Sequence, residues 1–133
     1  MTAPALKVLV VDDEEGIRET LRRVLAGCEV LTAADGTQAL RLAEAEKPDV
    51  VLLDVNMPGL DGLRVLELLL KGRPAGGPAV LMVTVETELG GAVKALSLGA
   101  YAYITKPFEA ERVRTAVAAA AEERARRLGG RAG

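Results

Sequence analysis

Three acidic side chains stand directly after apolar segments of the chain. Asp12 and Asp13 follow the apolar run 6–11, and Asp54 follows the apolar run 50–53. Short apolar runs separated by long amphipathic segments are typical of buried parallel strands. Acids at the carboxyl ends of such strands face the crevice where open α/β sheets bind ligands. We therefore expect three carboxylates in one small cavity, where they can bind a hard cation and offer an oxygen nucleophile.

The elements that must position these acids alternate along the chain. Helical periodicity, β-rich apolar runs and Gly/Pro punctuation predict ten segments. The predicted strands cover residues 6–11, 28–33, 50–53, 79–83 and 101–105, and the predicted helices cover 15–26, 37–46, 60–71, 87–98 and 109–127. This pattern predicts an α/β fold of the (βα)5 type, a doubly wound three-layer sandwich with a parallel sheet.

Composition narrows the classes of function. The 133 residues carry a net charge of −2, which does not favour direct binding of nucleic acid. The absence of histidine excludes histidine-based acid–base catalysis, histidine–metal sites and a phosphohistidine carrier. The single cysteine, Cys28, cannot form an internal disulfide and is expected to be a buried hydrophobe. No signal peptide or long apolar span is evident, so we expect a cytoplasmic protein that does not enter a membrane.

Several motifs occur together at the predicted strand ends. They are the pair Asp12–Asp13, the stretch 54–62 (DVNMPGLDG), Thr84 and the stretch 103–108 (YITKPF). With these motifs the chain resembles the receiver domain of two-component response regulators, of the chemotaxis-regulator type, from about residue 6 to about 122. The resemblance implies a flavodoxin-like sheet of strand order 2-1-3-4-5. We predict one receiver domain over residues 1–127, followed by a disordered tail over 128–133.

The acids suit phosphoryl transfer onto a carboxylate. Asp54 is the predicted nucleophile, because a carboxylate oxygen can attack phosphorus and form an acyl phosphate. Three carboxylates in one pocket repel one another, and an all-oxygen ligand set favours Mg²⁺ as the ion that relieves the repulsion. The resemblance implies metal contacts from Asp13, Asp54 and the backbone carbonyl of Asn56, with Asp12 acting mainly through water. Capping of the first helix is the alternative role for the acidic pair.

Three further residues have expected roles beside the acids. The ammonium of Lys106 can neutralise a phosphoryl oxygen, and the Thr84 hydroxyl can hydrogen-bond to it. The resemblance implies a cis peptide between Lys106 and Pro107, and a switch in which Thr84 moves toward the phosphoryl group while Tyr103 rotates inward. Each residue also has an ordinary structural role as its alternative. Lys106 could be a solvated surface lysine, Thr84 an ordinary strand-end residue and Tyr103 a core residue.

The resulting prediction is a binding module controlled by phosphorylation. Asp54 would accept a phosphoryl group from a sensor histidine kinase or a phosphotransfer protein. The chain itself would catalyse its phosphorylation and dephosphorylation, and we expect no other enzymatic activity. The face formed by residues 87–98, 101–105 and 109–127 would then change and control a downstream protein or an output domain, and a homodimer through this face stays open. Alternatives are the N-terminal receiver of a larger DNA-binding transcriptional regulator, and a receiver-like scaffold that works without phosphate. A dehalogenase-type phosphatase is disfavoured, because Asn56 stands where that class has a second Asp.

Three features depart from the family pattern or modulate it. Val85 stands where the family usually has Ala or Gly. Its branched side chain is expected to slow both the phosphorylation of Asp54 by small donors and the hydrolysis of the resulting acyl phosphate. Asn56 and Glu86 stand where relatives tune the lifetime of the phosphate. The pair Gly90–Gly91 weakens the start of its predicted helix, which indicates a soft signalling face.

Overall fold

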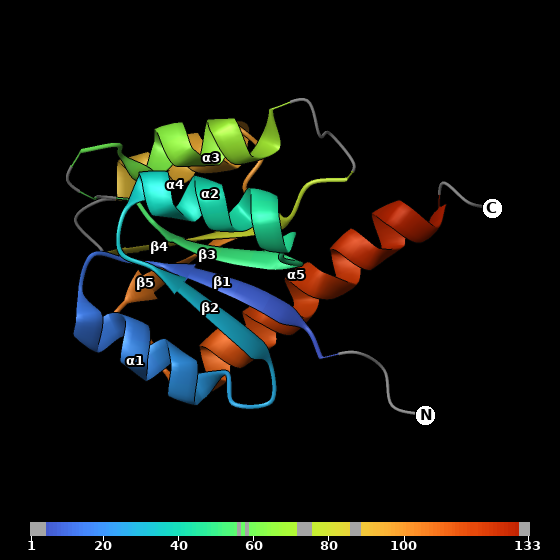
Figure 1. The fold of residues 1–133 in the computed structure, drawn as a ribbon, viewed down its shortest axis with the longest axis horizontal. Helices are drawn as coiled ribbons and strands as arrows, with labels where there is room; N and C mark the ends of the chain where they lie inside the picture. Colours follow the sequence, from blue (N-terminus) through green and yellow to red (C-terminus); the bar gives the residue numbers. More distant parts are fainter. Residues whose placement is uncertain (1–4, 56, 58, 72–75, 86–88, 131–133) are drawn as a thin grey trace.

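The computed structural model describes residues 5–55, 57, 59–71, 76–85 and 89–130. Within these residues the strands form one parallel sheet of order β2-β1-β3-β4-β5, as the resemblance implied (Figure 1). The strands are β1 (Lys7–Val11), β2 (Glu29–Ala33), β3 (Val50–Asp54), β4 (Ala79–Val85) and β5 (Ala102–Lys106). The helices are α1 (Glu15–Val24), α2 (Gly36–Glu46), α3 (Gly62–Leu70), α4 (Leu89–Ser97) and α5 (Ala110–Gly130). The α/β doubly wound prediction is therefore confirmed.

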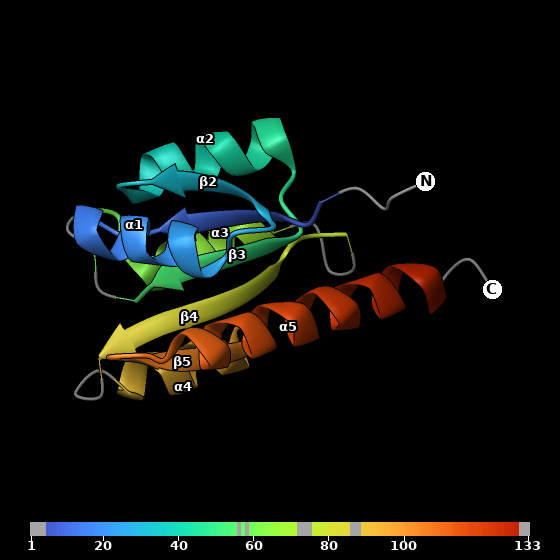
Figure 2. The same cartoon turned by 90° about the horizontal axis from the view of Figure 1, so that it is seen from below.

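Two hydrophobic cores lie on opposite faces of the sheet. Helices α2, α3 and α4 cover one face, and helices α1 and α5 cover the other (Figures 1 and 2). Alternate residues of each strand enter different cores because side chains alternate across a strand. The core under α2, α3 and α4 takes, for example, Leu9, Val51, Leu53 and Met82, and the core under α1 and α5 takes Val10, Leu52, Val83 and Ile104.

The helix starts follow from local side-chain hydrogen bonds. The Asp35 carboxylate accepts a hydrogen bond from the Gln38 backbone N–H at 2.8 Å and caps α2. In the same way Asp61 accepts from the Arg64 N–H at 3.0 Å and caps α3, so this helix begins at Gly62 and not at residue 60. Helix α4 is described from Leu89, and the first two residues of the predicted helix, 87 and 88, lie outside the described part.

The disordered tail expected at 128–133 needs correction. Helix α5 continues through Gly130, and residues 131–133 lie outside the described part of the chain. The Ala- and Arg-rich sequence has high helix propensity, and Arg127 donates to the Glu123 carboxylate at 2.9 Å one turn earlier. These two stabilising effects are consistent with a helix that continues past residue 127, where the sequence analysis placed its end.

The carboxyl-terminal half of α5 is anchored at the amino-terminal ends of the strands, opposite the end that carries the acids. The Arg124 guanidinium donates to the Gly77 carbonyl at 3.0 Å, just before β4, and to the Asp49 carboxylate at 3.2 Å, just before β3. Asp49 also accepts from the Lys7 backbone N–H at 2.9 Å at the start of β1. Arg124 thus ties the helix directly to the segments before β3 and β4 and, through Asp49, to the start of β1.

Two other expectations concern Cys28 and membranes. Cys28 is half-buried against the core under α1 and α5, less enclosed than expected, and burial raises the pKa of its thiol.

Among the helices of the described residues, none is both long enough and apolar enough to cross a bilayer.

Candidate functional site

Strand alternation directs the key side chains to one face. Asp12 extends the ladder of β1, since its N–H donates to the Ala33 carbonyl at 3.1 Å, while Asp54 and Lys106 are the last residues of β3 and β5. The residues two positions earlier lie in the core under α1 and α5; they are Val10, Leu52 and Ile104. Asp12, Asp54 and Lys106 therefore meet on that face at the carboxyl end of the sheet.

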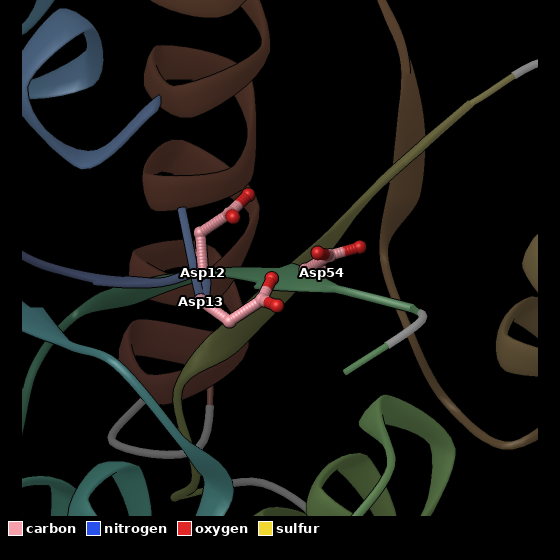
Figure 3. Close-up of side chains that lie close together, drawn as sticks. All are labelled: Asp12, Asp13 and Asp54. Atoms are coloured by element: carbon pink, nitrogen blue, oxygen red, sulfur yellow. The ribbon is translucent and has the colours of Figure 1, made fainter. Parts of the chain in front are cut away.

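The acids form a compact cluster at this end. Carboxylate oxygens of Asp12, Asp13 and Asp54 all lie within 4.8 Å of one another (Figure 3). Asp12 and Asp54 are buried, with 1% and 7% of their surface exposed, while Asp13 is exposed to solvent. Three oxygen ligands at this separation can hold a hard metal ion, and the exposed Asp13 leaves the cluster open to solvent.

Lys106 supplies positive charge to the cluster. Its Nζ donates to Asp12 Oδ2 at 2.9 Å and lies 3.6 Å from Asp54 Oδ2 and 3.8 Å from Glu14 Oε1. Burial by itself lowers the pKa of Lys106, but the hydrogen bond and charge of Asp12, with the charges of Asp54 and Glu14, outweigh burial and raise it. The side chain is 12% exposed, so it is not a solvated surface lysine.

The turn that carries the acidic pair is held by Asp12 itself. Its Oδ1 accepts from the Glu14 N–H at 2.9 Å, and its backbone carbonyl accepts from the Arg18 guanidinium at 2.7 Å. The residue at the amino-terminal cap of α1 is Glu14, which makes no capping bond with its side chain. The helix-capping role for the acidic pair is therefore wrong. Sequence reasoning missed Arg18, because a side chain that reaches back to a backbone carbonyl leaves no spacing signal.

Thr84 and Tyr103 lie on the other face of the sheet, toward α4. Thr84 follows the alternation of Met82 and is 1% exposed, and its hydroxyl donates to the Val85 carbonyl at 3.2 Å. Tyr103 is half-buried and packs against the same core under α2, α3 and α4. The two expected switch residues thus share the face that α4 covers.

Of the three residues expected to depart from the family pattern or to tune the phosphate lifetime, the structure describes only Val85. Val85 pairs in register with Lys106 and, by alternation with Val83, lies on the face of the acidic cluster with 42% of its surface exposed. The expected metal ligand Asn56 and the expected lifetime-tuning Glu86 lie outside the described residues. The peptide bond between Lys106 and Pro107 is cis, as the resemblance implied.

Helix α3 packs directly on the backbone of the predicted nucleophile. The Gly62 N–H donates to the Val55 carbonyl at 3.1 Å. A Cβ atom added to Gly62 would collide with the Asp54 carbonyl oxygen and would lie 2.8 Å from both Val55 Cα and the Val55 carbonyl oxygen. Only a residue without a side chain fits there. The sequence signal for this role was the glycine within the 54–62 motif.

Comparison with known families assigns the chain. The family model of the response regulator receiver domain matches residues 8–118. This match covers most of the chain, and the fold and the acidic cluster agree with it. The chain belongs to the response regulator receiver domain family.

Individual relatives show the same unit in larger proteins. The chain is 44% identical over 115 residues to the alkaline phosphatase synthesis transcriptional regulatory protein PhoP of Bacillus subtilis, covering 85% of this chain and 47% of PhoP. It is 42% identical over 109 residues to the response regulator MprA of Mycolicibacterium vanbaalenii, covering 80% and 46%. It is also 45% identical over 107 residues to a protein-glutamate methylesterase/protein-glutamine glutaminase of Maricaulis maris, covering 76% and 26%. The chain thus spans less than half the length of each of these relatives.

Solved structures agree in fold over nearly their whole length. The receiver domain of NtrX from Brucella abortus is 37% identical with a TM-score of 0.81, and the match covers 86% of this chain and 98% of that one. Chemotaxis protein CheY4 of Vibrio cholerae is 34% identical with a TM-score of 0.80, covering 87% and 98%. These structures match the doubly wound sheet found here.

Removal of one carboxylate should relieve repulsion in the cluster. We expect Asp13→Asn to raise the free energy of unfolding in the presence of a chelator by about 1 kcal/mol, the size of one pair repulsion near 4 Å in water. The same variant should lose most of the stabilisation that added Mg²⁺ gives the unmodified protein. Urea unfolding with EDTA and with Mg²⁺ measures both effects.

The matched control is Glu122→Gln, which removes a negative charge from an exposed position on α5. It should change stability by less than about 0.5 kcal/mol and should keep the Mg²⁺ response. An Asp13→Asn protein that is stabilised by Mg²⁺ as strongly as the unmodified protein would contradict the assignment of Asp13 as a metal ligand.

The Lys106 ion pairs should give a defined pH dependence. Lys106→Met leaves the Asp12 carboxylate buried without its ammonium partner and should lower stability at pH 7 by about 1–3 kcal/mol. Because the folded-state pKa of Lys106 is raised, its contribution is fully present below its ordinary value of 10.5 and is lost as the pH rises through the folded-state value. The stability difference between the two proteins should therefore shrink above pH 10.5.

Denaturant unfolding between pH 7 and pH 12 measures this difference, with exposed Lys94→Met as the control. The control difference should stay small at every pH. A Lys106→Met difference that is equally large at the highest pH would show that the ammonium charge is not its cause.

Proposed function

We propose that Asp54 accepts a phosphoryl group from the phosphohistidine of a sensor kinase or phosphotransfer protein, in a Mg²⁺-dependent reaction. The observation that carries this proposal is the buried Asp54 carboxylate beside two further acids and the Lys106 ammonium. A single nucleophile, a set of oxygen ligands and one fixed cation are the components that transfer of a phosphoryl group to a carboxylate requires.

The donor set fits Mg²⁺ better than a softer metal. The three clustered side chains offer carboxylate oxygens, the chain contains no histidine, and its one cysteine lies in the segment before β2. Asp13 and Asp54 would hold the ion, together with the carbonyl of Asn56, and Asp12 would act mainly through water. When bound, Mg²⁺ offsets the negative charge that the carboxylates and the phosphoryl oxygens bring together.

The chain's own residues then perform the transfer. An Asp54 oxygen attacks phosphorus, the new O–P bond replaces the P–N bond of the donor histidine, and the departing imidazole takes up a proton. Lys106 stands 3.6 Å from Asp54 and would shift from Asp12 toward the phosphoryl oxygens, where its charge is needed. The Thr84 hydroxyl would donate to the same group. Hydrolysis of the acyl phosphate restores Asp54, and we propose no enzymatic activity beyond this cycle.

The output follows from the position of Thr84 and Tyr103 beneath α4. Movement of Thr84 toward new charge at Asp54 would open space on the α4 side of the sheet, into which Tyr103 can turn. Arg112 of α5 donates to the Tyr103 carbonyl at 3.3 Å, so a change at Tyr103 also reaches α5. We propose that the α4–β5–α5 face thereby controls a downstream protein, an output domain or a second copy of the chain.

The relatives support a proposal about the kind of protein in which this receiver unit works. We propose that residues 1–127 form the receiver unit, with its core at about 6–122, and that it works in the cytoplasm. PhoP is named as a transcriptional regulatory protein, which supports a role as the receiver of a DNA-binding regulator in which this unit itself does not contact DNA. The methylesterase relative shows the same unit beside an enzymatic activity, so the output stays open.

Intact mass after incubation with acetyl phosphate and Mg²⁺ tests the proposed function. We expect one phosphoryl adduct that disappears with EDTA and is absent in Asp54→Asn. Adduct formation on Asp54→Asn would move the acceptor elsewhere. No adduct on the unmodified protein or on Val85→Ala would favour a scaffold that works without phosphate.

Val85 should limit the speed of the reaction. Its side chain lies on the face of Asp54 and beside Lys106 in register, so its removal should widen the approach to the acceptor. We expect Val85→Ala to raise the rates of phosphorylation by acetyl phosphate and of hydrolysis on the order of threefold, equal to about 0.6 kcal/mol in the barrier. Time courses of intact mass measure both rates. Exposed Val93→Ala on α4 is the control, and equal rates for Val85→Ala and the control would contradict the prediction.

A further inference from the structure

Helix α4 comes very close to the chain segment that carries the acceptor. Val55, the residue after Asp54, is 8% exposed and lies under the first turn of α4. A Cβ atom added to Gly91 would lie 2.8 Å from Val55 Cγ1, whereas carbon atoms in contact are about 3.5–4.0 Å apart. A side chain at residue 91 would therefore require either Val55 or the helix to shift.

Val55 is also held from the other sides. The valine side chain is stiff about χ1, so it cannot turn away freely. Its N–H donates to the Val83 carbonyl at 3.3 Å, and its own carbonyl accepts from the Gly62 N–H at 3.1 Å. Val55 is joined to Asp54 by a peptide bond, and the space beside the Asp54 carbonyl is too small for even a Cβ on Gly62 of α3, so a displacement of Val55 would also displace the acceptor.

The neighbouring Gly90 offers a contrast. A Cβ atom added there would have nothing within 4 Å, so its missing side chain serves no packing contact. The two glycines occupy consecutive positions in the first turn of α4. The glycine pair therefore has one member that softens the helix and one that permits its close approach to Val55.

We propose that Val55, clamped between Gly62 of α3 and Gly91 of α4, positions Asp54 for phosphoryl transfer and ties the place of α4 to the acceptor. Neither Val55 nor Gly91 touches the phosphoryl group, so both are positioning residues. A motion of Asp54 that shifts Val55 toward Gly91 would also shift α4, because the space between them is too small for one added carbon atom and protein interiors are close-packed. This inference rests on the proposed phosphorylation of Asp54.

The test compares Gly91→Ala with Gly90→Ala. Both substitutions give the first turn of α4 the same gain in helix propensity, and only the first creates the collision with Val55. With saturating acetyl phosphate and Mg²⁺, we expect Gly91→Ala to lower the maximal phosphorylation rate on the order of tenfold, because a small misplacement of a reacting group is costly. The KM for acetyl phosphate should stay unchanged, and Gly90→Ala should match the unmodified protein.

Removal of the Val55 methyl group that would collide should cancel the effect of Gly91→Ala on the maximal rate. In a Val55→Ala background, the further change Gly91→Ala should have little effect on the maximal rate, since the double-mutant cycle then lacks the contact. Hydrogen exchange without Mg²⁺ gives an independent readout: Gly91→Ala should reduce protection of the α4 amides, and Gly90→Ala should increase it.

The outcomes separate the two proposals. If the unmodified protein and Gly90→Ala are both phosphorylated and Gly91→Ala keeps the same maximal rate, the positioning role is wrong, whatever hydrogen exchange shows. The same holds if Gly91→Ala slows the reaction equally with and without the Val55 side chain. If neither the unmodified protein nor Gly90→Ala is phosphorylated, the proposed function itself fails and the positioning role fails with it.

Discussion

The site depends on one constraint, which is the concentration of negative charge at the carboxyl ends of the central strands. Asp12 and Asp54 are nearly removed from solvent, and unbalanced carboxylates in such a place are costly. Lys106 supplies the balance from within the chain, by a 2.9 Å contact to Asp12 and a longer one to Asp54. The protein thus carries its own counter-ion, which can be redistributed when a metal ion or a phosphoryl group enters. A site built in this way responds to added charge without any large motion of the sheet.

The strand order creates that concentration of charge. Asp12 and Asp54 are far apart in the sequence, but β1 and β3 are neighbours in the centre of the sheet because β2 is placed outside β1. In an open parallel sheet this reversal of strand order opens a crevice at the carboxyl ends. The two cores on either side of the sheet keep these central strands rigid, so their ends present the acids at fixed separations.

The parts of this arrangement that follow from periodicity were predictable. Apolar runs and their end points placed Asp54 and Lys106 at strand ends, and the motifs taken together implied the strand order by resemblance. Arg18 and the close approach at Gly91 were not predictable, because contacts between a side chain and distant backbone or between two packed elements leave no periodic mark. The continuation of α5 through Gly130 was missed because the ends of a chain are usually poorly ordered, and the tail was expected to follow that rule.

The anchor at Arg124 restricts how α5 can respond to events at the opposite edge of the sheet. A helix of 21 residues is about 30 Å long, and Arg124 fixes it near its far end to the segments before β3 and β4. A helix pinned at one end cannot slide as a whole. A displacement at the end near Lys106 would therefore be taken up as a tilt about Arg124, and the last turn beyond Arg124 would move in the opposite sense.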